Sequence, residues 1–291
     1  MQKERAFVKI TKIEVQKNNP ERYNIFTDQA GREAFTTGVD EAVLVQWDLK
    51  KGKELTEKEL ELLIEDDHER KAWNRALHYL SSVMRTEKEV YDHLIEKEFT
   101  EASAAKAVEK AKEYKFLNDR EFAKAYVRTK INTTDKGPKV IRMDLEKKGV
   151  SEKHVSEAMK ALTDELALDR AVAAAEKKGR QKKGESAGSV KQRLLQMLLR
   201  KGYDHETASA AVKEADFAPS EEDEWNSVLV QGEKAYRKWG NKLEGRALEQ
   251  KIKEYLYRKQ FPMEQIQRFI DEKREESEDG NGKKVQPDEQ A

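Results

Sequence analysis

The stretch "LEKKGVSEK", residues 145–153, is the most informative about the fold, because close relatives of it occur three more times along the chain. The others read "LIEKEFTEA" (94–102), "LLRKGYDHE" (198–206) and "LYRKQFPME" (256–264). All four follow the pattern Leu-x-x-Lys-x-apolar, and the apolar residues that end it are 51, 53 and 58 residues apart. Self-similarity at a period of about fifty residues is typical of repeat proteins.

Each copy has the features of a junction between two helices. The first helix carries apolar residues four apart, as expected for one buried face; the pairs are Val90/Leu94, Ile141/Leu145, Leu194/Leu198 and Ile252/Leu256. Gly149 and Gly202 supply the left-handed residue that often ends a helix. Glu98 and Gln260 replace that glycine, at a cost of up to about 1 kcal/mol if they adopt the same backbone conformation. Thr100, Ser151 or Asp204 then caps the next helix.

A further helical pattern precedes each junction, so the predicted unit has three helices. The fold class is mainly α: four tandem three-helix modules in an elongated curved array, preceded by a small antiparallel β unit. The predicted parts are the β unit (1–50), a linking helix with the first module (51–112), the second module (113–162), the third module with a basic loop at 177–189 (163–217), the fourth module (218–275) and a disordered acidic tail (276–291).

The composition narrows the classes of function. The 291 residues contain no Cys, which excludes disulfides and thiol nucleophiles and suits a reducing compartment. Lys and Arg balance Asp and Glu at 57 each, so net charge says nothing about partners. The sequence shows neither a transmembrane run nor a signal peptide. We expect a cytoplasmic monomer that does not act at a membrane and carries no cofactor.

The positions of the candidate residues do not match the patterns of catalytic or metal sites. The five histidines form no pair three or four residues apart, so no metal site is expected. "GRQKKGES" (179–186) resembles a P-loop, but Glu185 stands where the phosphate-binding Lys belongs, and a helical pattern precedes it. We interpret it as a flexible basic loop and predict that the protein is not an enzyme. In the helices after the junctions, acidic residues balance or nearly balance the basic ones, which disfavours sequence-specific reading of a DNA major groove.

Basic residues that gather in two modules are the candidates for contact with a partner or with DNA. Residues 177–201 hold nine bases and one acid, which favours phosphates or an acidic protein surface. The alternative is an ordinary solvated face. The candidates are Lys136, Lys139, Arg142, Lys147 and Lys148 in the second module, and Lys177, Lys178, Arg180, Lys182, Lys183, Lys191, Arg193, Arg200 and Lys201 in the third.

The stretch "KFLNDREFAKAYVRTKINTTDKGPKVIRMDLEKKGVS" (115–151) resembles the hallmark of the RecX family, regulators of the RecA recombinase. That hallmark is an aromatic-Leu-acidic-Asp block, then Phe-Ala, a Gly, an Ile and Leu-x-x-Lys-Gly-Ile. Asn118 replaces an acid and Val150 replaces the last Ile. The matching places are Phe116, Leu117, Asn118, Asp119, Phe122, Ala123, Gly137, Ile141, Leu145, Lys148, Gly149 and Val150.

The resemblance implies a non-catalytic protein that binds RecA–DNA filaments and most often inhibits ATP hydrolysis, strand exchange and coprotease activity. It also implies a role in recombination, DNA repair and the SOS response. Single- or double-stranded DNA, held through its phosphates, is a further candidate partner. The alternative is a helical-repeat scaffold that binds nucleic acid without RecA. We expect the hallmark residues to be structural: Phe116, Leu117, Phe122 and Leu145 in the core, and Asp119 at a helix start.

Overall fold

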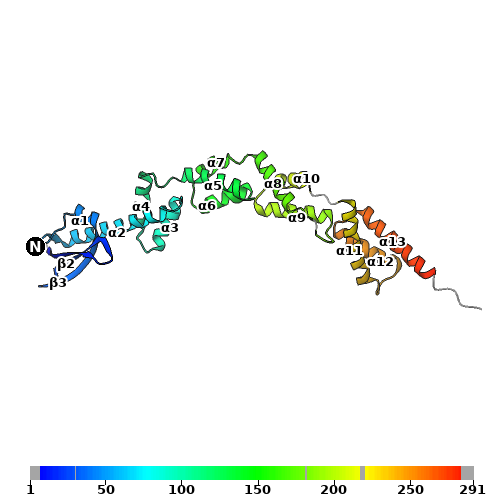
Figure 1. Ribbon diagram of the computed structural model, residues 1–291, viewed down its shortest axis with the longest axis horizontal. Helices are drawn as coiled ribbons and strands as arrows, with labels where there is room; N and C mark the ends of the chain where they lie inside the picture. The colour runs from blue at the N-terminus through cyan, green and yellow to red at the C-terminus, as the bar shows by residue number, and fades with distance from the viewer. Residues whose placement is uncertain (1–6, 30, 181, 217–219, 283–291) are drawn as a thin grey trace, which may run out of the picture. The chain divides into compact units, whose positions relative to one another are not determined.

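The computed structural model describes residues 7–29, 31–180, 182–216 and 220–282 (Figure 1). Within these residues it contains thirteen helices and one four-stranded antiparallel sheet. The chain divides into two compact units, one formed by 1–126 with 144–158 and the other by 127–143 with 159–291. The division passes through the second predicted module. The predominance of helices and the small N-terminal sheet confirm the predicted fold class.

The N-terminal sheet has the strand order β3-β2-β1-β4. Its strands are β1 (Phe7–Gln16), β2 (Asn19–Gln29), β3 (Arg32–Asp40) and β4 (Glu54–Thr56). The pairing of β1 with β2 shifts register between Ile10 and Lys12, where the alternation of apolar and polar residues slips in the sequence. Ile10, Ile25 and Val39 form the core of the sheet, together with residues of the first two helices.

The first two helices each begin directly after a residue whose side chain caps them. Helix α1 (Glu41–Gln46) is capped by Asp40, which accepts a hydrogen bond from the Ala42 N–H at 3.0 Å. Helix α2 (Glu57–Leu80) begins with the capping box of Thr56 and Glu59. The prediction of a separate linking helix before the first module is wrong, because α2 runs unbroken through both segments. No Gly or Pro interrupts 57–80.

Three helices form each module, as the periodicity predicts. The first module uses the end of α2 with α3 (Glu87–Glu96) and α4 (Glu101–Glu113). The other modules are α5 (Asp119–Thr133), α6 (Pro138–Lys147) and α7 (Glu152–Met159); α8 (Asp164–Lys178), α9 (Ala187–Lys201) and α10 (His205–Glu214); and α11 (Glu221–Trp239), α12 (Gly245–Arg258) and α13 (Met263–Gly282). The rest of the predicted tail, 283–291, lies outside the described residues.

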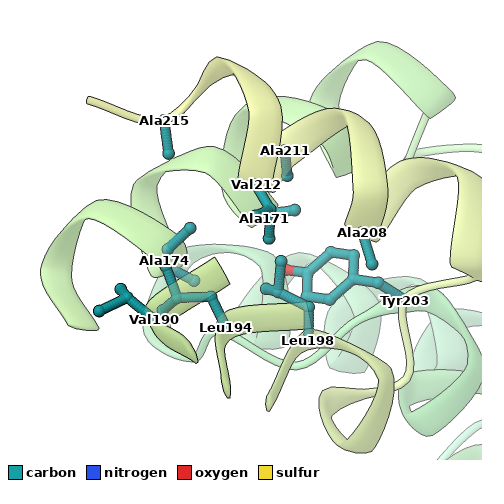
Figure 2. Packing of buried hydrophobic residues seen from close by; sticks show 11 residues of the cluster. Ala171, Ala174, Val190, Leu194, Leu198, Tyr203, Ala208, Ala211, Val212 and Ala215 are labelled. Atoms are coloured by element: carbon teal, nitrogen blue, oxygen red, sulfur yellow. The ribbon is translucent and has the colours of Figure 1, made fainter. Parts of the chain in front are cut away.

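Apolar residues predicted from the repeat are buried in every module. Leu94, Leu145, Leu198 and Leu256 are each 0% exposed. Figure 2 shows the core of the third module, where buried side chains from α8, α9 and α10 form one cluster and Tyr203 lies near Leu198 and Ala208. Alanines on α8 and α10 let these two helices pack closely against each other, so a small module can still bury a core.

The residue after the junction Lys adopts the left-handed conformation in all four copies. Its φ is 81° at Gly149 and 91° at Gly202. It is 64° at Glu98 and 61° at Gln260, which confirms that these two side chains accept the same strained backbone. The local geometry of the junction therefore comes from the repeat and not from glycine alone.

Replacing Glu98 by Gly is expected to raise the free energy of unfolding by up to about 1 kcal/mol, because Gly adopts a positive φ without steric cost. Urea denaturation followed by circular dichroism measures the change. Glu96→Gly is the matched control, since this residue ends the regular part of α3 and Gly there is expected to destabilise by about 0.5–1 kcal/mol. An equal decrease in the free energy of unfolding in both variants would contradict the proposed backbone strain at Glu98.

Successive modules are joined by contacts between helix ends within each unit. In the N-terminal unit, the Thr86 hydroxyl donates to the Lys148 carbonyl at 2.6 Å, and the Glu87 N–H donates to the Asp119 carboxylate at 2.9 Å. In the C-terminal unit, the Ser186 hydroxyl donates to the Lys259 carbonyl at 2.6 Å. The Ala187 N–H donates there to the Glu224 carboxylate at 2.9 Å. Each joint satisfies backbone groups that helix ends leave unpaired.

The joint between the second and third modules includes direct hydrogen bonds between backbone groups. The Gly137 N–H donates to the Lys201 carbonyl at 2.8 Å, and the Lys139 N–H donates to the Gly202 carbonyl at 3.0 Å. A β-carbon at Gly137 would lie 2.6 Å from the backbone of Gly202 and Tyr203, so only glycine allows this approach. Arg170 of α8 adds hydrogen bonds to the carbonyls of Thr134 at 2.8 Å and Lys136 at 3.1 Å.

Candidate partner-binding surface

Five of the candidate cations lie together where α8 ends and the segment toward α9 begins. We call them the basic loop: Lys177, Lys178, Arg180, Lys182 and Lys183. All five side chains are exposed. Lys177 and Lys178 occupy the last turn of α8, where the partial negative charge of the helix C-terminus favours cations. The basic loop is therefore a concentrated positive surface that solvent reaches freely.

An internal clamp holds this segment in shape. The Arg193 guanidinium donates to both oxygens of Glu185, at 2.8 and 3.1 Å, and to the carbonyls of Lys178 and Arg180. Burial acts to raise the pKa of Glu185, but Arg193 and the Lys182 N–H outweigh it and hold this pKa below its usual value. Arg193 is thus occupied inside the protein and positions the basic loop.

A second contact ties the segment to the fourth module. The Gln231 amide donates to the Gly184 carbonyl at 2.9 Å and accepts a hydrogen bond from the Tyr255 hydroxyl at 2.9 Å. Gly184 is buried with φ 74°. Arg193 and Gln231 thus make hydrogen bonds to the described residues of 179–186, and the predicted flexibility of this segment stays a prediction. A segment whose backbone is already held by such contacts loses less conformational entropy when a partner binds to its cations.

The other candidates divide into paired and exposed side chains. Lys148 forms an ion pair with Glu89, and Lys201 forms one with Asp135 at 2.6 Å. Lys136 and Arg142 are half-buried and have interactions within the chain. The exposed ones are Lys139, Lys147, Lys191 and Arg200. The basic loop thus contains most of the accessible positive charge among the candidates.

A patch of aromatic rings is exposed in the N-terminal unit, which sequence reasoning did not predict. Tyr114 is 60% exposed and Phe116 is 55% exposed, and their rings are 6.1 Å apart. Both rings lie against Trp73, at 5.7 and 6.3 Å. The Lys110 ammonium lies 5.0 Å from the Trp73 ring. Exposed aromatic side chains of this kind are common where proteins meet partners.

The described residues show neither a metal-binding group nor a membrane span. No three His, Asp or Glu side chains within them are grouped so that they could hold a metal ion. No helix in the same part of the chain is long and apolar enough to cross a bilayer.

Comparison with protein families assigns the chain segment by segment. The "Regulatory protein RecX N-terminal domain" matches residues 8–56. The first three-helix domain of RecX matches 72–110 and the second matches 118–159. The third three-helix domain matches twice, at 164–212 and at 221–270. The chain belongs to the RecX family. Its fourth module is a second copy of the third RecX domain.

Curated RecX relatives cover almost the whole chain. "Regulatory protein RecX" of Halalkalibacterium halodurans is 39% identical over 264 residues, which is 90% of this chain and 99% of the relative. The protein of the same name from Bacillus pumilus is 40% identical over 263 residues, covering 90% and 98%. A crystal structure of a regulatory protein RecX aligns with a TM-score of 0.59 at 35% identity, covering 71% of this chain and 100% of that one.

Most of the RecX hallmark residues are buried, as predicted. Leu117 is 4% exposed, Phe122 is 7% exposed and Leu145 is fully buried. Ala123, Ile141 and Val150 also belong to the core. The prediction that Phe116 is a core residue is wrong. The N–H groups of Phe116 and Leu117 both donate to the Ala111 carbonyl as α4 ends, and only Leu117 enters the core.

Asp119 of the hallmark begins α5, as predicted, and also caps a different helix. Its carboxylate is buried and accepts the hydrogen bond from the first N–H of α3. Burial raises the pKa of Asp119, although the Glu87 N–H opposes this shift. Asp119 therefore acts at the joint between the first and second RecX modules, a role that sequence spacing within α5 could not show.

Proposed function

We propose that this RecX-family chain binds filaments of the RecA recombinase on DNA and lowers their ATPase, strand-exchange and coprotease activities. It would act in this way in the control of recombination, DNA repair and the SOS response. The observation that carries the proposal is the match of RecX domains along the chain from residue 8 to residue 270. The curated relatives are named regulatory proteins, which supports a role without catalysis.

Tandem modules suit a partner that is itself a polymer. Each module offers its own surface, and weak contacts with successive protomers of a filament add through effective concentration. The joints through Thr86 and Ser186 connect the helix ends of neighbouring modules directly. This favours a chain that binds through several modest contacts, with a steep loss of affinity when modules are removed.

The basic loop supplies the charged part of this interaction. Its five exposed cations lie within seven residues and are anchored by Arg193 and Gln231. Phosphates of filament DNA and acidic loops of a protein partner both fit such a surface. The same feature supports the second candidate function, a helical-repeat scaffold that binds nucleic acid directly and independently of RecA.

The test is a titration of the protein into RecA on single-stranded DNA while ATP hydrolysis and strand exchange are measured. We expect both rates to fall as the protein saturates the filament. A RecA-independent ATPase on the same DNA serves as control and is expected to keep its rate. Unchanged hydrolysis and exchange, together with no binding to the filament, would refute the proposed function.

A further inference from the structure

A groove between α9 and α10 of the third module has the features of a peptide-binding site. It has a volume of about 300 Å³ and is lined by Lys191, Gln192, Leu195, Ser209, Val212 and Lys213. Its apolar lining residues are Leu195 and Val212, which we call the floor, and its two exposed lysines are Lys191 on α9 and Lys213 on α10, which we call the rim lysines. This volume is at the lower end of the range of ligand pockets, about 300–1,000 Å³. It suits one apolar side chain and its neighbours.

The two rim lysines are free to bind a partner. Both side chains are exposed, and neither forms an ion pair within the part of the chain that the structure describes. In contrast, Lys201 and Arg193 of the same helix are held by Asp135 and Glu185. A ligand that brings carboxylates to both rims would therefore complete two ion pairs without breaking any.

The polar residues of the groove are held in place. Gln192 accepts a hydrogen bond from the Gln260 amide of the fourth module. Ser209 lies 3.4 Å from the ring nitrogen Nδ1 of His205. The groove is thus bounded by fixed polar groups beside an apolar floor, as in sites that take one apolar side chain in a defined orientation.

The equivalent positions of the other modules do not combine an apolar floor with two cations. Counted from the repeat, Lys191 and Lys213 correspond to Glu87 and Glu109 in the first module, and to Glu249 and Asp271 in the fourth. The second module has Pro138 and Lys160 at these two places, and Arg142 stands where the third module has Leu195. The combination of charge and apolar floor belongs to the third module alone.

A second groove on α10, facing α8, has the opposite charge. It measures about 410 Å³ and is lined by Leu168 and Ala210 together with Asp164, Glu165, Asp204 and Glu206. An acidic ligand is repelled there and attracted to the groove with Lys191 and Lys213. The two faces of α10 therefore discriminate between ligands by sign of charge.

We propose that the α9–α10 groove binds an acidic peptide segment in which an apolar side chain is flanked by Asp or Glu. The apolar side chain would lie on Leu195 and Val212, and its flanking carboxylates would pair with Lys191 and Lys213. A nucleic-acid backbone supplies the negative charge but no aliphatic or benzyl group for the floor. This inference does not rest on RecA, so it can hold or fail independently of the proposed function.

The probe is a fluorescein-labelled twelve-residue peptide of Asp and Glu with Leu and Phe at its centre, and the readout is fluorescence anisotropy with the full chain. We expect saturable binding that weakens about tenfold in the variant K191E/K213E, as two exposed ion pairs become repulsive. The matched control K153E/K160E makes the same change of charge on exposed lysines outside the groove. It is expected to bind within about twofold of the parent chain, since distant exposed charges are screened.

A second peptide separates recognition of the groove from simple attraction of charge. With Ser in place of Leu and Phe, binding is expected to fall at least about fivefold, because the floor is left unfilled. Methyl NMR signals of Leu195 and Val212 are expected to shift with the first peptide only. Equal binding of both peptides, equal loss in the two charge variants, or equal displacement by a twelve-residue oligothymidine would overturn the proposal. Circular dichroism of each variant checks that it is folded.

Discussion

Replacing Phe122 by Ala is expected to lower the free energy of unfolding of the second module by about 3–5 kcal/mol. The Phe122 ring is 7% exposed and stacks on Tyr126 at a centroid distance of 5.9 Å. The Lys148 ammonium lies 5.7 Å from the ring, so the substitution removes a cation–π contact as well as buried area. Amide hydrogen exchange measures the effect locally, because modules of a repeat protein can open separately.

Phe116→Ala is the matched control for Phe122→Ala. It removes the same atoms from the same hallmark, but the Phe116 ring is 55% exposed. The free energy of unfolding is expected to fall by less than about 1 kcal/mol, since most of the surface of Phe116 already contacts water. A large loss at Phe116 with a small loss at Phe122 would contradict the assignment of core and surface in this segment.

Replacing all five basic-loop residues by Ala is expected to weaken binding to RecA–DNA filaments by about 10- to 100-fold at low salt. The folded state is expected to be unaffected, because the five side chains are exposed while Arg193 and Glu185 keep the loop in shape. The difference between parent and variant is expected to shrink as salt rises. Fluorescence anisotropy of the labelled protein on preformed filaments gives both quantities.

The control for the basic loop removes an equal amount of charge from exposed lysines elsewhere. These are Lys58, Lys153, Lys160, Lys234 and Lys242. We expect this control to lose less than about threefold in affinity, because scattered exposed charges contribute little. Equal affinity of the basic-loop variant and the parent at low salt would show that the loop is only a solvated face.

Much of the fold follows from local features of the sequence. The repeat places Leu94, Leu145, Leu198 and Leu256 correctly in four cores. Caps and left-handed residues are short-range devices, and so the junction at Glu98 could be predicted even without a glycine there. Helix caps and left-handed residues depend on residues only a few positions apart, so they can be predicted from the sequence.

What could not be predicted depends on residues far apart in the chain. Thr86 reads as the cap of its own helix, yet it also bonds to the carbonyl of Lys148, 62 residues away. Phe116 and Leu117 are adjacent and both apolar, and no periodicity in a turn tells which one enters the core. Likewise, counting the charges in the sequence does not show that Arg193 binds Glu185. Such contacts are set by tertiary packing.

The most direct measurement compares binding of the labelled chain to RecA-coated single-stranded DNA with binding to the same DNA bare, single- and double-stranded, at one salt concentration. A RecA-filament regulator is expected to bind the coated DNA at least about tenfold more tightly than either bare form, because several modules contact the protein polymer at once. Equal or tighter binding to bare DNA would contradict this function and favour a scaffold that binds nucleic acid directly.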